Sequence, residues 1–497
     1  MWENFMVRFA RTQPDKRALL DRLTGLSWSY QQLAQEIDRR AGQLCAHGVG
    51  AGDRIVWVAT SCLEHLTLFF AAIRLGAILV PLNPRLAPQE MAEICQDVAP
   101  RLLLGSAIPP LLHTHPSYRD WQNLGEVAPL PAEAPIPDTQ ILMILYTSGS
   151  TGRPKGVMLH AGMILANMQA TVATDVLRPD DITLINTPFF HTGGYHVFTL
   201  PLFSIGGTLI LHEKFDPGLV LQEIHTAGVT VFWAVPTMFQ AIHDHPDFVH
   251  TDLRAIRFFL SGGAPLPLAL IQSYHQRGVP FKQGFGLTEV GPNCFLLETH
   301  AAFDHPDSIG KPMPHCQARI VDEQGQPVAA NQVGELWLRG AHRCAGYWHQ
   351  EELFTASLRG DYFVTGDLVR CDDEGYFYVV GRKKEMYISG GENVYPGEVE
   401  KILNRHPDIG LAVVVAVNHP KWHEVGLAFY TATRTFTLAE MRGYLDPLLA
   451  RFKHPHHLIQ LSEMPLLANG KIDRPQLKKR ASEAGFLIEA QQEPGIK

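Results

Sequence analysis

Short aliphatic runs alternate with longer, helix-patterned segments before residue 310, and this rhythm constrains the fold more than any other feature. The runs include "DRIVWVAT", "GAILVPL", "ITLINTPFFH", "GGTLILHE" and "VTVFWAVPT". Strands buried on both faces of a parallel sheet read as continuous Val, Ile and Leu, and helices cover both faces. The pattern therefore predicts an α/β fold, in which a large N-terminal domain holds helix-covered, mostly parallel sheets.

The texture changes from about residue 310. "ARIVDEQGQPV", "GELWLRG" and "GYFYVVGR" are short, bounded by turns and partly alternating, which is typical of antiparallel strands. A compact segment with helix signals and the strand "LAVVVAV" follows. We expect a large domain over 1–382, including a β-rich subdomain, and a small mobile α+β domain over 383–497 with a hinge near Lys384.

Charge and cysteine usage exclude several classes of protein. A formal net charge of −8 over 497 residues argues against a non-specific nucleic-acid binder. Seven scattered cysteines form no CxxC pair, which argues against a thiolate metal site and suits a reducing, cytoplasmic compartment.

Targeting and membrane signals are also absent from the pattern. The N-terminus lacks the apolar core and cleavage site of a signal peptide. The longest apolar stretch, "LTLFFAAIRLGAILVPL", is interrupted by Arg74, Gly76 and Pro81. We interpret it as a buried helix that runs into a strand, and expect no transmembrane segment.

The segment "YTSGSTGRPKGV" follows the apolar run "ILMIL" and is rich in hydroxyls, glycines and cations. Glycines let backbone N–H groups approach phosphate oxygens, hydroxyls add donors, and Lys155 and Arg153 offset charge. Its register is not that of a P-loop. On local grounds a surface linker explains it as well as a phosphate loop does.

Further segments decide between these two readings. "GFGLTEVGP", "GELWLRG", "YFVTGDL", "GRKKEMYISGGENVYPGEVE" and "LLANGKIDR" follow in order, and "GAILVPLNPRL" precedes them. The complete set resembles the adenylate-forming superfamily, which contains acyl-CoA synthetases, adenylation domains and luciferases. The chain is most similar to a fatty-acyl-CoA synthetase.

The resemblance implies a site for ATP and for coenzyme A. Phosphate contacts would come from the loop, adenine contacts from "SGGAP" and "GFG", ribose contacts from Asp367 and Arg382, and contacts with CoA from "SGGEN" and Trp422. The implied binding residues are Thr147, Ser148, Gly149, Ser150, Thr151, Gly152, Lys155, Gly262, Gly263, Ala264, Pro265, Gly284, Phe285, Gly286, Asp367, Arg382, Gly390, Gly391 and Trp422.

The resemblance also implies the catalytic groups. Lys471 would stabilise the charge that gathers when a carboxylate attacks the α-phosphate, and Thr288 would contact that phosphate. Glu289 would help hold Mg²⁺, and His191 would gate the passage between the acyl pocket and the thiol tunnel. The small domain would then rotate about Lys384 and bring Gly390 and Gly391 to the pantetheine.

Three histidines depart from the family pattern. His423 replaces a glycine after Trp422, and His454 and His456 stand where relatives carry Arg or Lys. Neutral imidazoles would grip CoA phosphates less well than protonated ones. We therefore expect the Michaelis constant for CoA to rise between about pH 6 and about pH 8. A metal site at these histidines is a weaker alternative.

The sequence thus predicts an ATP-dependent carboxylic acid–CoA ligase that forms an acyl-adenylate. "FFHTGG" favours a medium- or long-chain fatty acid, with Tyr195, His196, Trp233 and Val235 as neighbours of the acyl group. Aryl and short-chain acids, and a separate carrier protein as acceptor, remain alternatives. A non-catalytic nucleotide-binding protein is disfavoured, because the reactive positions are intact. A homodimer is left open.

Overall fold

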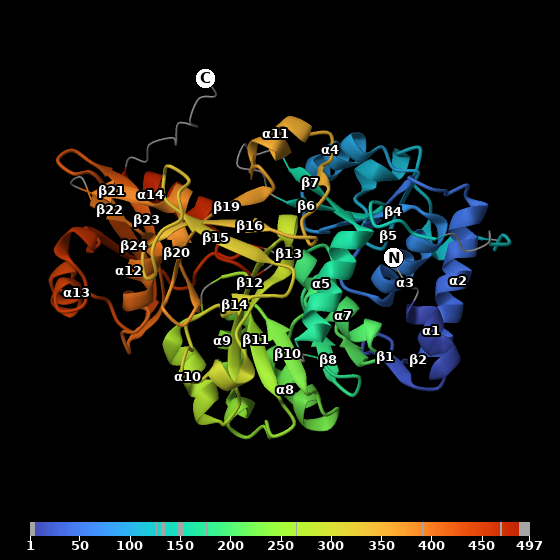
Figure 1. Cartoon of the computed structure of the whole chain (residues 1–497), viewed down its shortest axis with the longest axis horizontal. Helices are drawn as coiled ribbons and strands as arrows, with labels where there is room; N and C mark the ends of the chain where they lie inside the picture. Colours follow the sequence, from blue (N-terminus) through green and yellow to red (C-terminus); the bar gives the residue numbers. More distant parts are fainter. Residues whose placement is uncertain are drawn as a thin grey trace.

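Figure 1 shows the computed structural model of the chain. The structure describes residues 5–125, 127–130, 135–147, 154–174, 177–264, 266–389, 392–467 and 470–486. In Figure 1 the last elements of the chain, drawn in orange and red, gather at one end of the molecule, and α1 and α2 lie at the other. Eight of the expected site residues fall outside the described ranges: Ser148, Gly149, Ser150, Thr151, Gly152, Pro265, Gly390 and Gly391.

The first sheet forms from the earliest aliphatic runs. Its strands, in spatial order, are β17 (Gly346–Tyr347), β7 (Lys155–His160), β6 (Ile141–Thr147), β4 (Ile78–Leu82), β3 (Arg54–Val58) and β5 (Leu102–Gly105). The pairs among β3, β4, β5 and β6 are parallel, and β7 and β17 add antiparallel edges. The run at 66–82 is the buried helix α3 (Leu63–Leu75) followed by β4, as the sequence predicted.

The second sheet carries the later aliphatic runs. Its order is β14 (Lys311–Pro312), β13 (Gly291–Leu296), β12 (Phe281–Leu287), β11 (Phe258–Ser261), β10 (Val231–Ala234), β8 (Ile182–Ile185), β9 (Thr208–Leu211), β1 (Arg17–Asp21) and β2 (Ser27–Ser29). The stretch from β12 to β1 is parallel, and the strands outside it pair antiparallel. The prediction of mostly parallel, helix-covered sheets is confirmed.

The helices supply the apolar faces that close the core. In the large domain they are α1 (Phe5–Thr12), α2 (Tyr30–Ala46), α3, α4 (Pro88–Val98), α5 (Ala161–Ala173), α6 (Thr192–His196), α7 (Thr199–Ser204), α8 (Pro217–Thr226), α9 (Pro236–Asp244), α10 (Leu268–Gln276) and α11 (Glu351–Ala356). Short 3₁₀ turns occur at η1 (Pro110–Thr114), η2 (Trp121–Asn123), η3 (Pro246–Val249), η4 (Thr288–Val290) and η5 (Thr299–Ala301). One continuous cluster of buried side chains joins the two sheets through α2, α3, α5 and α7.

The β-rich subdomain is antiparallel, as its alternating pattern predicted. It contains β15 (Gln317–Val321), β16 (Gly334–Arg339), β19 (Tyr362–Cys371), β18 (Leu358–Arg359) and β20 (Phe377–Arg382). Asp367 on β19 is the register partner of Arg382 on β20. Pairing of these two strands therefore fixes the separation of the two residues assigned to the ribose.

A separate sheet forms the small C-terminal part. Its strands are β22 (Glu392–Val394), β21 (Tyr387–Ser389), β24 (His423–Ala432), β23 (Ile409–His419) and β25 (His457–Gln460). Helices α12 (Pro396–Leu403), α13 (Leu438–Leu445) and α14 (Arg474–Glu483) and the turn η7 (Arg451–Lys453) pack around it. Lys384 lies in η6 (Lys383–Glu385), between β20 and this sheet. Its hinge role, and the boundary at residue 382, remain predictions.

None of the helices in the described part of the chain combines the length and the apolar character that crossing a bilayer requires.

Candidate active site

The ends of strands from three sheets bring the expected nucleotide residues together. Thr147 ends β6, and Lys155 begins β7 on the other side of a connection that lies outside the described residues. The Thr147 hydroxyl is buried and has no hydrogen-bond partner among the residues that the structure describes. A buried hydroxyl without a partner is costly unless a ligand supplies one, so it fits an anion or another polar group at this strand end.

Lys155 meets the carboxylate expected to hold magnesium. Its ammonium lies 2.7 Å from Glu289 Oε1 and donates to the Tyr347 hydroxyl at 2.7 Å. Tyr347 in turn donates to the same carboxylate oxygen at 3.0 Å. Burial and the neighbouring Glu289 raise the pKa of Tyr347, so its proton stays in place. The three groups form one closed polar cluster at the start of β7.

Asp367 and Arg382 form the second polar pair of the site. The guanidinium Nε lies 2.6 Å from Asp367 Oδ1, whereas Oδ2 is buried without a hydrogen-bond partner. Burial raises the pKa of Asp367 to about 6, against the opposing effect of Arg382 and Lys471. An unpartnered carboxylate oxygen at a strand pair is suited to hydroxyl donors such as those of ribose.

Lys471 reaches this site from the small domain. The chain around it forms a tight hairpin, in which Leu466 bridges to Ile472 and Leu467 N–H donates to Lys471 O. The Thr237 hydroxyl donates to Gly470 O at 2.7 Å, which anchors the hairpin on the large domain. A Cβ placed on Gly263 would lie 2.9 Å from Lys471 Cε. These contacts between the two domains place the Lys471 side chain beside Gly263, one of the residues expected to contact the nucleotide.

The electrostatics agree with that position. Burial, and then Arg382, lower the pKa of Lys471, and Asp367 opposes them. Burial, and then Lys471, lower the pKa of His191 to about 4, so its ring is neutral at pH 7. His191 is the N-cap residue of α6, and its Nε2 is buried without a partner. The structure therefore brings Lys471, Asp367, Arg382 and His191 together.

The two glycine-rich segments expected to contact adenine lie at the ends of the neighbouring strands β11 and β12. Gly262, Gly263 and Ala264 follow β11, and Gly263 has a φ of +84°. Gly284, Phe285 and Gly286 lie at the end of β12, where Thr288 begins η4. A Cβ on Gly286 would lie 2.3 Å from the Gly291 carbonyl, so only glycine fits there. Phe285 is half-buried and packs edge-on against Phe295 at 5.7 Å. An adenine contact at Phe285 remains a prediction.

Trp233 fills the space next to the expected acyl pocket. Its indole N–H donates to Gly193 O at 3.1 Å, and a Cβ on Gly193 would lie 2.5 Å from Trp233 Cζ2. A Cβ on Gly262 would lie 3.8 Å from the same indole. Trp233 therefore stands between α6 and the nucleotide loop. It also lines a small cavity with nine other residues: Thr183, Leu184, Ile185, Asn186, Thr187, Gly193, Gly194, Phe198 and Thr199.

The other expected neighbours of the acyl group are buried. Tyr195 donates to His65 O at 2.8 Å and packs on Phe189, so it belongs to the core. His196 is fully enclosed, burial lowers its pKa to about 4, and its Nε2 has no partner. Val235 precedes α9 and would contact a Cβ on Gly470 at 3.0 Å.

Comparisons with known proteins agree with this geometry. The model of the AMP-binding enzyme family matches residues 6–348, and that of the AMP-binding enzyme C-terminal domain matches residues 398–471. The chain belongs to the AMP-binding enzyme family. It is 35% identical to a feruloyl-CoA synthase of Amycolatopsis sp over 95% of this chain and 98% of the relative. It is 33% identical to an indoleacetate–CoA ligase of Aromatoleum aromaticum over 97% and 98%.

A solved structure shows the same architecture. The o-succinylbenzoate CoA synthetase of Bacillus subtilis, in complex with its acyl-adenylate intermediate, superposes with a TM-score of 0.88 at 29% identity. The match covers 96% of this chain and 98% of that one. The predicted superfamily is confirmed. This AMP-binding enzyme is an acid–thiol ligase of the acyl-CoA synthetase type, which works through an adenylate with ATP and CoA as co-substrates.

The residues expected to bind CoA lie on the small domain of this AMP-binding enzyme. Trp422 is 37% exposed in the turn between β23 and β24, with Lys421 Nζ 4.6 Å from its ring centroid. Its neighbour His423 has a φ of +66°, in the left-handed region where glycine is favoured. A glycine at this position would adopt that conformation without strain.

The histidines of the small domain differ in what they can offer. His454 is buried, and its Nε2 lies 3.0 Å from Leu449 O, so it is engaged within the domain. His456 is half-buried against His419, and their ring centroids are 5.3 Å apart. Burial, and then the nearby charges of His419, Arg442, His457 and His454, lower the pKa of His456. His456 therefore gains its positive charge at a pH below 6.5, the ordinary pKa of the imidazole.

Sequence reasoning missed two contributors to the AMP-binding enzyme site. Tyr347 lies on β17, which pairs with β7 and so sets its hydroxyl against Lys155. The Thr237 hydroxyl donates to Gly470 O and so anchors the hairpin that carries Lys471. Neither residue belongs to a recognisable spacing pattern. Both depend on contacts between segments far apart in the sequence. For Tyr347, a prediction that residues 346–347 pair as a strand with β7 could have placed it in the site.

Proposed function

We propose that this enzyme activates a carboxylic acid carrying an aromatic ring and transfers the acyl group to CoA. The observation that carries the proposal is Trp233, whose indole lies against Gly193 and near Gly262, next to the expected acyl pocket. A flat ring can lie against an indole, and such aromatic contacts contribute about 0.5–1.5 kcal/mol beyond the burial of area. The relatives named for ferulate, indoleacetate and succinylbenzoate support this substrate class.

The polar atoms near Trp233 favour the same class. The side-chain oxygens of Thr183, Asn186 and Thr187 and the Ser261 hydroxyl are buried without a partner. An alkyl chain over these atoms would leave them unsatisfied, and each such group costs about 1–3 kcal/mol. A ring that carries a hydroxyl, amine or carbonyl would satisfy them. The proposal therefore differs from the sequence-based preference for a fatty acid.

The first half-reaction would use the groups beside Lys155. Thr147 and Lys155 would contact the ATP phosphates, Asp367 and Arg382 the ribose, and Phe285 the adenine. Attack of the substrate carboxylate on the α-phosphate gives acyl-AMP and pyrophosphate. Lys471 would donate to the oxygens on which negative charge gathers, since a buried ammonium acts strongly in a dry site.

Glu289 has the chemistry that a Mg²⁺ site requires. Hard cations prefer carboxylate oxygens, and Glu289 faces the phosphate side through its bond to Lys155. When bound, Mg²⁺ would neutralise phosphate charge. Phosphates arriving between the two groups would replace the Lys155–Glu289 contact, so that the ammonium holds phosphate and the carboxylate is released.

The second half-reaction needs a different face of the small domain. Rotation near Lys384 would remove Lys471 and break the bond from Thr237 to Gly470. Gly390 and Gly391 would then line the thiol passage, Trp422 would contact CoA, and His191 would open the way to the acyl group. The CoA thiol attacks the acyl-adenylate carbonyl, and AMP leaves.

ATP–pyrophosphate exchange against a panel of acids tests the substrate class. We expect ferulate, indoleacetate or 2-succinylbenzoate to give a kcat/KM at least about tenfold above those of octanoate and palmitate. Addition of CoA to the best acid should then give a thioester. A fatty acid at the head of the panel would refute the aryl proposal, and exchange without thioester would point to a carrier-protein acceptor.

A further inference from the structure

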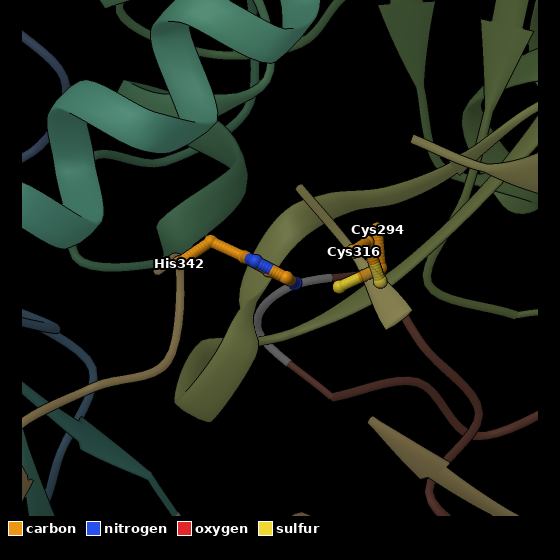
Figure 2. A group of neighbouring side chains, drawn as sticks. All are labelled: Cys294, Cys316 and His342. Atoms are coloured by element: carbon orange, nitrogen blue, oxygen red, sulfur yellow. The ribbon is translucent and has the colours of Figure 1, made fainter. Parts of the chain in front are cut away.

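Two thiols and one imidazole that the reaction does not use lie together behind the nucleotide site. They are Cys294, Cys316 and His342, and one ligand atom from each lies within 4.8 Å of the other two. Figure 2 shows the His342 ring directed toward the two cysteine side chains. Exposure is 0% for Cys294, 8% for Cys316 and 5% for His342, so the group is enclosed.

The three residues come from different parts of the fold. Cys294 is in the middle of β13, Cys316 directly precedes β15, and His342 follows β16. A ligand bound by all three would link the edge of the nine-stranded sheet to the β-rich subdomain. No sequence spacing of the metal-binding kind joins them, which is why the sequence argued against a thiolate site.

The local backbone holds the imidazole in position. A Cβ on Gly340 would lie 2.5 Å from His342 Nδ1 and 2.1 Å from the His315 carbonyl, so only glycine admits the ring here. His315, next to Cys316, has a φ of +69°. His342 Nε2 is buried and makes no hydrogen bond. A buried imidazole nitrogen without a partner needs a proton donor, a proton acceptor or a metal ion.

We propose that Cys294, Cys316 and His342 form a binding site for a thiophilic divalent cation, Zn²⁺ being the best match. Two thiolates and a neutral imidazole are the donors that zinc prefers, with bonds of about 2.3 Å to sulfur and about 2.1 Å to nitrogen. The ligand atoms of a tetrahedral site of this kind lie about 3.5–3.8 Å apart, so side-chain movements of about 1 Å would bring the three ligand atoms to these separations.

Charge balance favours the same ion. Binding releases one proton from each thiol, and the two thiolates then neutralise Zn²⁺, so no net charge is buried. Three protein ligands leave a fourth position for water or another small ligand. Magnesium, which the nucleotide reaction uses, prefers oxygen donors and does not compete here.

The site touches the nucleotide loop through Cys294. Its thiol proton is shared between two carbonyl oxygens, Val290 O at 3.1 Å and Gly291 O at 3.2 Å, both directly after Glu289 in the chain. Deprotonation on metal binding ends those two hydrogen bonds. Cys344 lies two residues after His342, and its backbone N–H donates to Glu289 O at 2.7 Å. Metal occupancy therefore bears on both chain segments that hold Glu289.

Cobalt substitution of the reduced, full-length enzyme tests the proposal. After chelation, titration with Co²⁺ should give about one equivalent bound, with an intense sulfur-to-cobalt charge-transfer band and the visible absorption of tetrahedral cobalt, and Zn²⁺ should displace both. Cys316→Ser and His342→Gln should each weaken binding at least about tenfold. Cys95→Ser is the matched control, because Cys95 is also buried but lies in α4, and it should bind like the parent enzyme.

A second measurement needs no variant. Zn²⁺ should protect Cys294 and Cys316, but not Cys95, from alkylation in partly denaturant-opened enzyme, as read by peptide mass spectrometry. Absence of the charge-transfer band, equal binding by Cys316→Ser, or equal protection of all three cysteines would overturn the proposal. A Cys294–Cys316 disulfide in the purified enzyme, two hydrogens lighter by mass, would overturn it too and assign the pair to redox chemistry.

Discussion

The raised pKa of Asp367 makes a quantitative prediction about nucleoside binding. The carboxyl titrates at about 6, chiefly because it is buried, and its Oδ2 atom has no partner until a ligand arrives. If ribose hydroxyls donate to the ionised form, the affinity follows the ionised fraction of the empty enzyme. That fraction is about 0.9 at pH 7 and about 0.1 at pH 5, so the dissociation constant should be about tenfold higher at pH 5 than at pH 7.

The assay is calorimetric titration with adenosine between about pH 5 and about pH 8. Adenosine is preferable to AMP because it lacks the phosphate, whose own pKa near 6 would overlap with that of Asp367. Asp367→Asn should bind more weakly at pH 7 and show no dependence on pH, because the amide does not titrate. Equal affinity at both ends of the range in the parent enzyme, or the same tenfold change in Asp367→Asn, would refute the reasoning.

The ionisation of Asp367 affects the stability of the fold in the opposite direction to its effect on ligand binding. The folded-state pKa of Asp367 lies above 3.8, the ordinary value of an aspartic acid, so the folded chain binds more protons than the unfolded chain between these two pH values. Stability contributed by Asp367 is therefore fully present below about pH 4 and is lost as pH rises through about 6. The loss amounts to about 3 kcal/mol for a shift of about 2 units. Nucleotide binding recovers part of it by giving the ionised form its missing donors.

Four further changes probe other parts of the enzyme. Lys471→Ala should lower pyrophosphate exchange at least about 100-fold yet spare thioester formation from supplied acyl-AMP, while the exposed Lys479→Ala is unchanged; equal loss of both half-reactions would contradict that division. Trp233→Ala should shift preference toward longer acids by about tenfold in relative kcat/KM, and an unchanged panel ranking would remove the indole from the pocket. Protonation of His456 should lower the Michaelis constant for CoA only below about pH 6.5, because its pKa is lowered, and a transition nearer pH 7 would argue against that residue. His423→Gly should remove the strain of a left-handed backbone conformation and raise the free energy of unfolding by about 1 kcal/mol, seen as a higher midpoint of thermal unfolding. A lower midpoint would contradict this prediction.

The strand rhythm was sufficient to predict the fold because burial is a local property of these runs. "DRIVWVAT", "GAILVPL" and "VTVFWAVPT" became β3, β4 and β10, each buried along most of its length. The strands β15, β16 and β20 were also predicted, since short, turn-bounded and partly alternating runs are typical of antiparallel strands. The order of strands within each sheet was beyond this reasoning, because it depends on crossovers rather than on composition.

The roles expected for the site residues rest on the family resemblance. For Asp367 and Arg382 the structure adds a local reason for their proximity, because they are register partners on strands that a short turn connects. Lys471 and His191 were named by resemblance alone, and nothing local reveals that the ammonium lowers the pKa of that imidazole. The proposed preference for an aryl substrate was less accessible still, since it rests on the position of the Trp233 indole.

The Cys294, Cys316 and His342 group shows why some chemistry escapes a one-dimensional reading. Metal motifs are recognised by short spacings because a turn or a helix brings such residues together without help from the fold. Here Cys294 lies on β13 of the nine-stranded sheet, whereas Cys316 and His342 lie beside the paired strands β15 and β16 of the β-rich subdomain, and the folded core brings the two sheets together. Such a site can bind its ion only in the folded chain, so metal binding should raise the midpoint of thermal unfolding in proportion to occupancy. The parent enzyme and Cys95→Ser should show that rise with added Zn²⁺, and Cys316→Ser should not; a rise of equal size in all three would trace the effect to non-specific binding instead.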